Sequence, residues 1–373
     1  GLAQRERLVR GAVGPLLSQL DEQQLAQAVE ALAAPLREVL PSACTSDAWT
    51  PERVAAARLL FYLLAAPQAR RVEVPLQWLS QHWPWLEAAV ASPSAQEPAV
   101  EAACHALTTV LAQGRGSSVT SEVLQRAVPM LAEASASRGS AAALSALATL
   151  ARVFKGGGDE ATARLFAVHA AGAARRLLGE SAGGEQVAQL PPDLLAALLE
   201  LFTIALGPRS KLLAAQLYQA PEALAGVVAP VAMALPSCTS PRVVCWGLLL
   251  CDRLPQWLES PDLGPRAAQL LDAALPGAAA SACRLLAASP LAQDPEVCNA
   301  LGKALLRLSR ARPDAMRLAL LNAMGALGIK PEEGELLLQQ LADPLANEDG
   351  LGEALRETAA AWQVEHLRRL LAA

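Results

Sequence analysis

The stretch VEAACHALTTVL, residues 100–111, decides how this chain is interpreted. Its apolar side chains recur three and four positions apart, the spacing of one face of an α-helix: Val100, Ala103, Cys104, Leu107, Val110 and Leu111. The same stretch sets Cys104 beside His105, and the glycine-rich segment GRGSS follows at residues 114–118. Two interpretations are open: a packed helix with a turn, or a nucleophile and base beside a phosphate-binding loop.

Helix geometry favours the first interpretation. Cys104 lies on the apolar stripe, so we expect a buried thiol with a raised pKa and little reactivity. His105 lies about 100° further round the helix, so the two side chains point apart and do not form a nucleophile–base pair. GRGSS follows a helix rather than a strand and lacks the lysine of a phosphate-binding loop. We therefore predict a structural helix that ends in a turn.

The composition predicts a helical chain. Hydrophobic residues make up 53% of the 373 residues and aromatic residues only 3%, with alanine and leucine prominent. Alanine and leucine favour helices, whereas the aromatic residues that favour strands are scarce. The net charge of -5 is too mild and of the wrong sign for a nucleic-acid-binding protein.

Cysteines and histidines give no sign of a catalytic or metal site. The seven cysteines contain no C-x-x-C pair, so we expect free thiols in a reducing compartment. The four histidines, His82, His105, His169 and His366, are isolated from one another, which argues against a metal site. We expect no enzyme activity, no metal and no cofactor.

Neither a membrane segment nor a leader is expected. The most conspicuous uncharged run, residues 223–241, is interrupted by Pro230 and Pro236, and a membrane-spanning helix needs about 20 continuous apolar residues. The chain begins without a charged and then apolar segment, so no signal peptide is predicted.

Turn signals divide the chain into helical segments. Helix starts are indicated by a capping residue before proline or by a capping box, at Thr50–Pro51, Ser240–Pro241, Asp294–Pro295 and Asp21 with Gln24. Taken in pairs, the segments give a unit of about 47 residues, near the period of HEAT and armadillo repeats. The eight pairs are 2–40, 50–91, 94–135, 139–179, 191–234, 240–290, 293–328 and 331–373. The predicted fold is all-α, a right-handed α-solenoid of HEAT-like helix pairs that forms one array over residues 1–373.

The densest aromatic stretch is WLSQHWPWLEAAV, residues 78–90. Its core stripe is predicted as Leu79, Trp83, Leu86 and Val90, with Trp78 and Trp85 on a neighbouring face. Pro84 removes one helical hydrogen bond, so a bend is expected there. We favour packing between adjacent repeats over a ligand platform.

This stretch resembles the W-P-x-L helix in the C-terminal half of karyopherin-β transport receptors, in the transportin-SR and importin-thirteen branch. The resemblance continues through VEAACHALTTVL, LFTIALGPRSKLLAAQLYQ (residues 201–219) and LRETAAAWQVEHLRRLLAA (residues 355–373). It spans nearly the whole chain, although most matching positions are core positions of HEAT helices.

The resemblance implies a nuclear import receptor that holds protein cargo on a concave face and releases it to the GTPase Ran in its GTP form. The main Ran-binding repeats would lie in N-terminal repeats that this chain lacks. It also implies nucleoporins as candidate partners and a location in cytoplasm and nucleus. Neither nucleic acid nor a membrane is expected as a partner, for the reasons of charge and composition given above. The alternative is a static HEAT-repeat scaffold or regulatory subunit for protein assembly.

One departure concerns the cargo. In transportin-SR the helix that matches residues 100–112 carries arginines that receive phosphorylated Arg-Ser cargo. By this resemblance the row falls on His105, Thr108 and Ala112, where this chain has no arginine. Glu101 shares their side of the helix. We call Glu101, His105, Thr108 and Ala112 the candidate face, and we predict that it does not select phosphorylated cargo.

Overall fold

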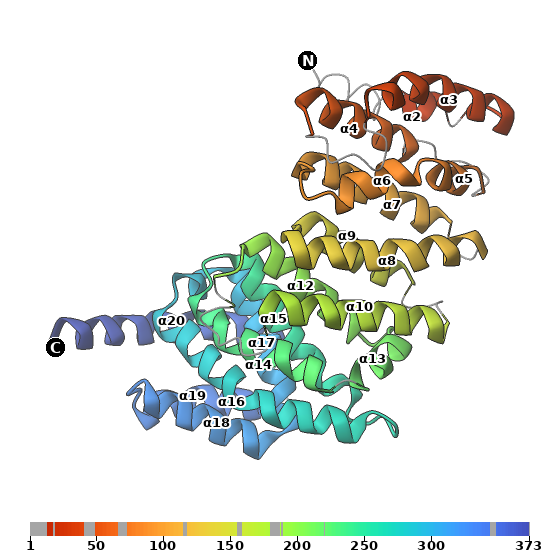
Figure 1. Ribbon diagram of the computed structural model, residues 1–373. Coiled ribbons are helices and arrows are strands. Elements are labelled where there is room, and N and C mark those ends of the chain that lie inside the picture. Colours follow the sequence, from red (N-terminus) through yellow and green to blue (C-terminus); the bar gives the residue numbers. More distant parts are fainter. Residues whose placement is uncertain are drawn as a thin grey trace. The chain divides into compact units, whose positions relative to one another are not determined.

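The protein is almost entirely helical (Figure 1). The structure, a computed structural model, describes residues 13–17, 19–40, 49–65, 73–114, 118–154, 159–179, 187, 189–219, 221–343 and 348–372. No residue within these ranges lies in a strand. Consecutive helices pack against their neighbours along the sequence, which confirms the predicted class of an all-α helical-repeat solenoid.

The chain forms two compact units, residues 1–173 and 174–373. The helices of the first unit are α2 (Gly14–Leu17), α3 (Glu22–Val39), α4 (Pro51–Ala65), α5 (Glu73–Gln81), α6 (Trp83–Ala91), α7 (Glu97–Gln113), α8 (Ser118–Arg138) and α9 (Ala141–Phe154), with α10 (Glu160–Leu178) crossing the boundary. Within this unit α4, α7 and α9 pack side by side as one layer, and α6 and α8 form a second layer against them.

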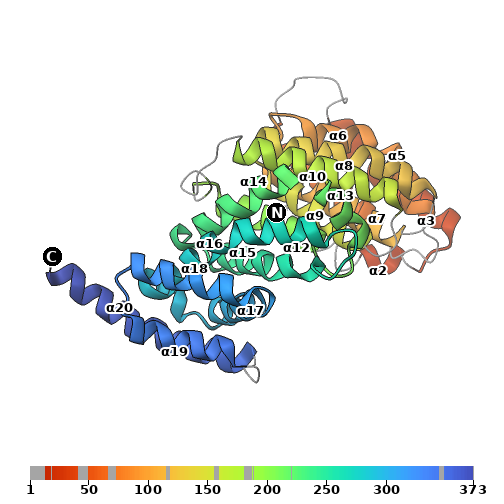
Figure 2. The same ribbon diagram turned by 90° about the horizontal axis from the view of Figure 1, so that it is seen from below.

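The second unit repeats this two-layer arrangement. Its helices are α12 (Pro192–Ala205), α13 (Lys211–Tyr218), α14 (Pro221–Ala234), α15 (Pro241–Arg253), α16 (Gly264–Ala288), α17 (Pro295–Ala311), α18 (Pro313–Ala326), α19 (Pro331–Ala342) and α20 (Glu348–Ala372), with 3-10 turns η2 (Leu235–Ser237), η3 (Leu254–Trp257) and η4 (Pro290–Gln293). One layer contains α12, α15, α17 and α20, and the other contains α14, α16 and α18 (Figure 2).

Most of the predicted helix starts are capped by side chains. The Asp21–Gln24 capping box is confirmed, with Gln24 N donating to Asp21 Oδ1 at 2.8 Å. Asp294 accepts from the backbone of α17 at Glu296 N, 2.8 Å. Thr50 Oγ1 accepts a longer bond from Arg53 N. The prediction for Ser240 is wrong: its side chain makes no capping bond, and Pro241 alone marks the start of α15.

The aromatic stretch is interrupted rather than bent. α5 ends at Gln81, His82 lies between the helices, and α6 begins at Trp83 with Pro84 in its first turn. Proline lacks the N–H that a continuing helix needs, but its fixed φ suits a first turn, so a new helix starts here. The predicted bend is therefore corrected to a break.

The side chains around this break are core residues. Leu79, Trp83, Leu86 and Val90 are all buried, as predicted. Trp78, expected on a neighbouring face, is buried as well. The guanidinium of Arg126 on α8 lies 4.3 Å from the Trp83 ring centroid. The stretch thus packs between neighbouring helices rather than forming an open aromatic surface.

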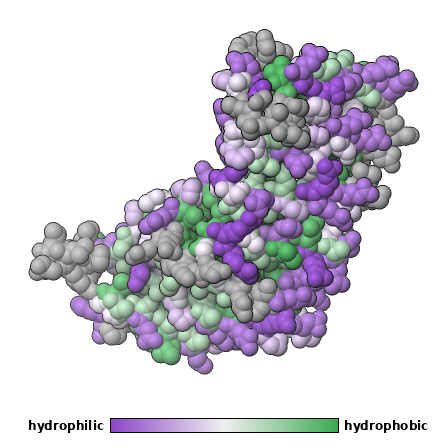
Figure 3. Space-filling view, in the orientation of Figure 1, coloured by the Kyte–Doolittle hydropathy of each residue, from purple (hydrophilic) through white to green (hydrophobic). Residues whose placement is uncertain are grey.

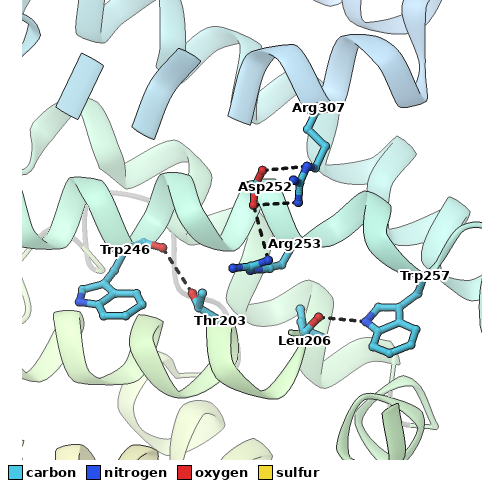
Figure 4. A network of polar contacts seen from close by, with 7 residues as sticks. All are labelled: Thr203, Leu206, Trp246, Asp252, Arg253, Trp257 and Arg307. Atoms are coloured by element: carbon cyan, nitrogen blue, oxygen red, sulfur yellow. Dashed lines mark hydrogen bonds and ion pairs between the residues drawn. The ribbon is translucent and has the colours of Figure 1, made fainter. Parts of the chain in front are cut away.

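Polar bonds tie successive helix pairs together within each unit. In the second unit Trp257 Nε1 donates to Leu206 O at 2.9 Å, and Thr203 Oγ1 bonds Trp246 O at 3.5 Å (Figure 4). The bonded residues are 51 and 43 positions apart. The bond from Trp257 satisfies the carbonyl of Leu206, the residue that caps the C-terminus of α12. Both bonds join one helix pair to the next.

One described helix, α16, is long and apolar enough to cross a membrane by length and composition alone. Of its most apolar window, 67% is buried inside the second unit, and a buried core helix has the same composition. Elsewhere, exposed hydrophobic residues form small groups among hydrophilic ones on the visible face (Figure 3).

Candidate partner-binding face

The candidate face lies on the solvent side of α7, between α4 and α9. Glu101, His105 and Ala112 are exposed and Thr108 is half-buried. The buried side chains of the helix, Cys104 among them, face the core. The face is therefore accessible to a partner across the middle of the first unit's α4–α7–α9 layer.

Cys104 has the buried environment that the sequence predicts. Its side chain is 4% exposed, and burial raises the pKa of the thiol strongly, with smaller contributions from the carboxylates of Glu97 and Glu101. The neutral thiol is thus the stable form at physiological pH, and the thiol is buried whereas His105, about 100° further round α7, is exposed. The two residues do not form a nucleophile and base.

His105 is in contact with Tyr62 of α4. The two ring centroids are 5.7 Å apart and the planes are tilted by 57°, a common geometry for aromatic pairs. Tyr62 is largely buried, so it fixes the imidazole from the side of the neighbouring helix. No local sequence pattern indicates this pair, although the two residues are 43 positions apart, the same separation that joins Arg138 to Ala95.

Thr108 and Ala112 offer little to an anionic ligand. Thr108 Oγ1 donates to backbone oxygens of its own helix, at 2.9 Å to Cys104 O and 3.1 Å to His105 O. Its hydroxyl proton is therefore used within α7, and only the oxygen's acceptor capacity remains. Ala112 adds a methyl group.

Two charged side chains hold the helices beneath the face. Glu97, in the first turn of α7, accepts from Ser140 Oγ at 3.0 Å at the start of α9. Arg138, at the end of α8, donates to Val90 O at 2.8 Å and Ala95 O at 2.7 Å. The bond of Glu97 ties α7 to the start of α9, and those of Arg138 tie α8 to α6 and to the connection that leads into α7, so the face is presented on a rigid support.

The candidate face carries one charged side chain, and two arginines belong to the neighbouring helices α4 and α9. Glu101 supplies an exposed carboxylate, while Arg58 lies one turn before Tyr62 on α4 and Arg152 is exposed on α9. Both arginines already interact within the protein. The face therefore presents an imidazole, a methyl group, acceptor oxygens and one carboxylate, which suits shallow contact with another protein surface.

The glycine at the end of α7 has a packing role. A side chain at Gly114 would meet Leu76 Cδ1 and Thr120 Oγ1 at 2.9 Å, and Thr120 donates to Gly114 O at 2.5 Å. Close approach therefore explains this residue without a phosphate. Residues 115–117 lie outside the described residues, as do Cys44 and the side chain of His366.

Other candidate ligands are also dispersed. Within the described ranges, no three His, Cys, Asp or Glu side chains gather as a metal site would require. Cys251 and Cys283 are buried, and burial raises the pKa of each to about 12.

No protein-family model matches this chain, and a search of the curated proteins finds no match.

Proposed function

We propose that this chain binds a protein partner along its exposed helix faces, as the cargo-holding part of a nuclear import receptor of the karyopherin-β kind. In the whole receptor, Ran in its GTP form would control release. The specific assignment rests on the resemblance of the helices at residues 78–90 and 100–111 to those receptors. Partner binding in general rests on the fold, because stacked helix pairs offer long surfaces for other proteins.

The observation that carries the proposal is the construction of the candidate face. Three successive helices, α4, α7 and α9, form one layer. Side chains from the first two meet at Tyr62 and His105. Bonds from Glu97 and Arg138 fix the helices beneath. A broad, shallow and rigid surface of mixed chemistry suits a folded protein better than a small substrate, which needs a concave pocket.

A static scaffold is the second candidate, and one observation favours it. Asp252 and Arg307 form a two-bond ion pair between α15 and α17, which resists sliding of one helix pair on the next. A scaffold benefits from that rigidity, whereas a receptor that releases cargo must change conformation.

The two candidate functions predict different sets of partners and a different response of partner binding to Ran in its GTP form. The chain fused to a biotin ligase should label Ran, nucleoporins and a varied set of nuclear proteins in cells if it is a receptor. A partner identified in this way is then bound to the purified chain and challenged with Ran carrying a GTP analogue or GDP. Binding that is weakened only by the GTP form supports the receptor. Binding that survives both, with one constant set of partners, supports the scaffold.

The role of the candidate face is tested with a matched pair of variants. Ala112→Trp places a large side chain at an exposed position of the face, and Ala315→Trp does the same at an exposed position of α18. We expect only Ala112→Trp to weaken partner binding. Equal binding by both variants would remove the face from the proposal.

A further inference from the structure

A small cavity lies within the second unit between α13, α14 and α16. Its volume is about 220 Å³. The apolar part of its wall comes from Leu224 and Leu270, both buried, and from Ala273. Its polar lining residues are Tyr218, Arg266 and Gln269. The cavity belongs to neither the candidate face nor the bonds that join the layers.

The size of the cavity restricts its occupant. Pockets that take whole small molecules are typically about 300–1,000 Å³. A cavity of about 220 Å³ is smaller, but it is large enough for one aliphatic side chain. Binding of a single anchoring side chain in a pocket is a common feature of protein–protein interfaces.

Tyr218 is the buried aromatic residue of the cavity wall. Its side chain is 1% exposed, and burial raises the pKa of the Tyr218 phenol to about 12, so the hydroxyl keeps its proton. The hydroxyl oxygen is itself closed off from solvent. The polar side chains that the cavity offers to an occupant are therefore those of Arg266 and Gln269.

Arg266 gives the cavity a positive rim. Its Nη1 donates to the backbone oxygen of Tyr218 at 3.0 Å, which holds the guanidinium beside the cavity. No described carboxylate pairs with Arg266, and Asp272, the acid on the same helix, is bonded to Arg312 at 2.9 Å. In sequence, α13, α14 and α16 carry three basic and two acidic residues. The other N–H groups of Arg266 remain available for an anion.

We propose that this cavity binds one aliphatic side chain of a partner protein, of the size of leucine or isoleucine, and that a carboxylate next to it pairs with Arg266. Charge complementarity favours this occupant over a neutral or basic one, because the guanidinium is held in place and matches a carboxylate with two parallel bonds. A guanidinium that is already positioned loses less freedom on binding, which favours affinity.

The proposal takes its partner class from the proposed function, but its chemistry can be tested without cargo or Ran. The probes are 4-methylpentanoate and 4-methylpentanamide, which share one branched chain and differ in charge. Each is titrated against the full chain, and binding is followed by ligand-observed NMR. We expect the acid to bind at least about fivefold more tightly than the amide, and its advantage to shrink as salt is added.

Three variants locate the site. Arg266→Gln should remove the advantage of the acid and leave binding of the amide unchanged. Ala273→Leu should weaken both probes, because the larger side chain reduces the cavity. Arg284→Gln, an exposed arginine of the same helix, should change neither. Circular dichroism and melting temperature check that each variant is folded.

Several results would overturn the proposal. These are equal affinity for acid and amide, an equal effect of Arg266→Gln and Arg284→Gln, or no binding of either probe at tens of millimolar. The proposed function can fail separately. If the probes bind as expected but no partner responds to Ran, the proposed ligand site in the cavity is supported and the import-receptor function is rejected. If a partner is released by Ran but neither probe binds, the import-receptor function is supported and the proposed ligand site is rejected.

Discussion

The carboxylate of Asp252 on α15 accepts two bonds from the guanidinium of Arg307 on α17. Asp252 Oδ1 lies 3.1 Å from Arg307 Nε, and Asp252 Oδ2 lies 3.2 Å from Nη1 (Figure 4). The Asp252 side chain is 7% exposed, whereas that of Arg307 is 41% exposed. Arg253 is further away, with Nη1 at 3.9 Å from Oδ2. The pair therefore joins two successive helix pairs through one nearly buried charge.

The first prediction concerns this pair. Arg307→Gln leaves the Asp252 carboxylate without its two-bond partner, and a poorly compensated buried charge destabilises a protein. We expect a loss of about 1–3 kcal/mol, less than for a fully buried pair because Arg307 reaches solvent. Urea denaturation measures the change. Arg284→Gln on the surface of α16 is the control, and an equal effect of both variants would contradict the assigned role.

Two glycines in the second unit should respond in opposite ways to alanine. Gly226 is exposed on α14 with open space around it, so Gly226→Ala should stabilise the protein by about 0.5–1 kcal/mol through the unfolded state. At Gly247 an added Cβ would overlap the buried Leu235 side chain, so Gly247→Ala should cost about 1–3 kcal/mol. Melting temperatures that move in the same direction would contradict this packing.

The prediction for His82 is an acid-sensitive stability. Burial, with a smaller contribution from Arg37, lowers the pKa of His82, although the bond between Nδ1 and Trp78 O at 2.8 Å opposes this. As the pH falls through about 6.5, the unfolded chain takes up a proton that the folded chain resists, so stability falls. The contribution of neutral His82 to the free energy of unfolding is fully present above about pH 6.5. Below that pH it is lost, by at most about 1.4 kcal/mol per pH unit.

His82→Asn tests this prediction because asparagine keeps an N–H donor but does not titrate. Melting temperatures of both proteins are compared between pH 7 and pH 5. The curve of the wild-type chain should fall more steeply than that of the variant. Parallel curves would show that His82 is not responsible for acid sensitivity.

The buried thiols give a prediction about reactivity. Alkylation of the native chain at pH 8, read by peptide mass spectrometry, should modify half-buried Cys238 and Cys245 before buried Cys104 and Cys251. Burial raises the pKa of every one of these thiols, so the accessibility of each thiol to the alkylating reagent decides the order of modification. Cys104→Ala should leave partner binding unchanged and cost about 1 kcal/mol. Rapid, selective labelling of Cys104 would reopen the nucleophile interpretation.

Local patterns predicted the fold class well because they depend on neighbouring residues. The apolar stripe that contains Cys104 and the capping box at Asp21 both follow from helix geometry over a few positions. The predicted cap at Ser240 failed because the residue type permits a capping bond but does not require it, and the Ser240 side chain makes none. The break at His82 was missed because proline tolerates either a kinked helix or a new one, and packing decides between them.

The sites depend on contacts that no local pattern shows. Helix geometry placed Glu101, His105 and Ala112 on the solvent side of α7, but Tyr62 comes from another helix 43 residues earlier. The cavity could not be predicted from the sequence either, because two of its residues, Tyr218 and Arg266, are 48 positions apart. Each residue taken alone looks like an ordinary helix end or a surface arginine, so only the register between helix pairs brings them together.

The last prediction concerns phosphorylated cargo. A phosphoserine carries roughly -1.5 to -2 charges near neutral pH, and its oxygens suit the fork of a guanidinium. The candidate face offers no such fork: His105 is held against Tyr62, the Thr108 proton is bonded within α7, and Glu101 repels an anion. We therefore expect the chain to bind phosphorylated and plain Arg-Ser peptides equally in side-by-side titrations at two salt concentrations. A preference for the phosphorylated form that disappears at high salt would contradict this expectation and point to another arginine cluster.

Arginines installed together at 105, 108 and 112 should create such a preference. The control places three arginines with the same spacing at the exposed positions 315, 318 and 322 of α18, which adds equal charge elsewhere. If both triple variants gain the same affinity, net charge explains the gain. If only the α7 variant discriminates between the peptides, the position of the candidate face on α7 explains it, because both variants carry the same three added arginines at the same spacing.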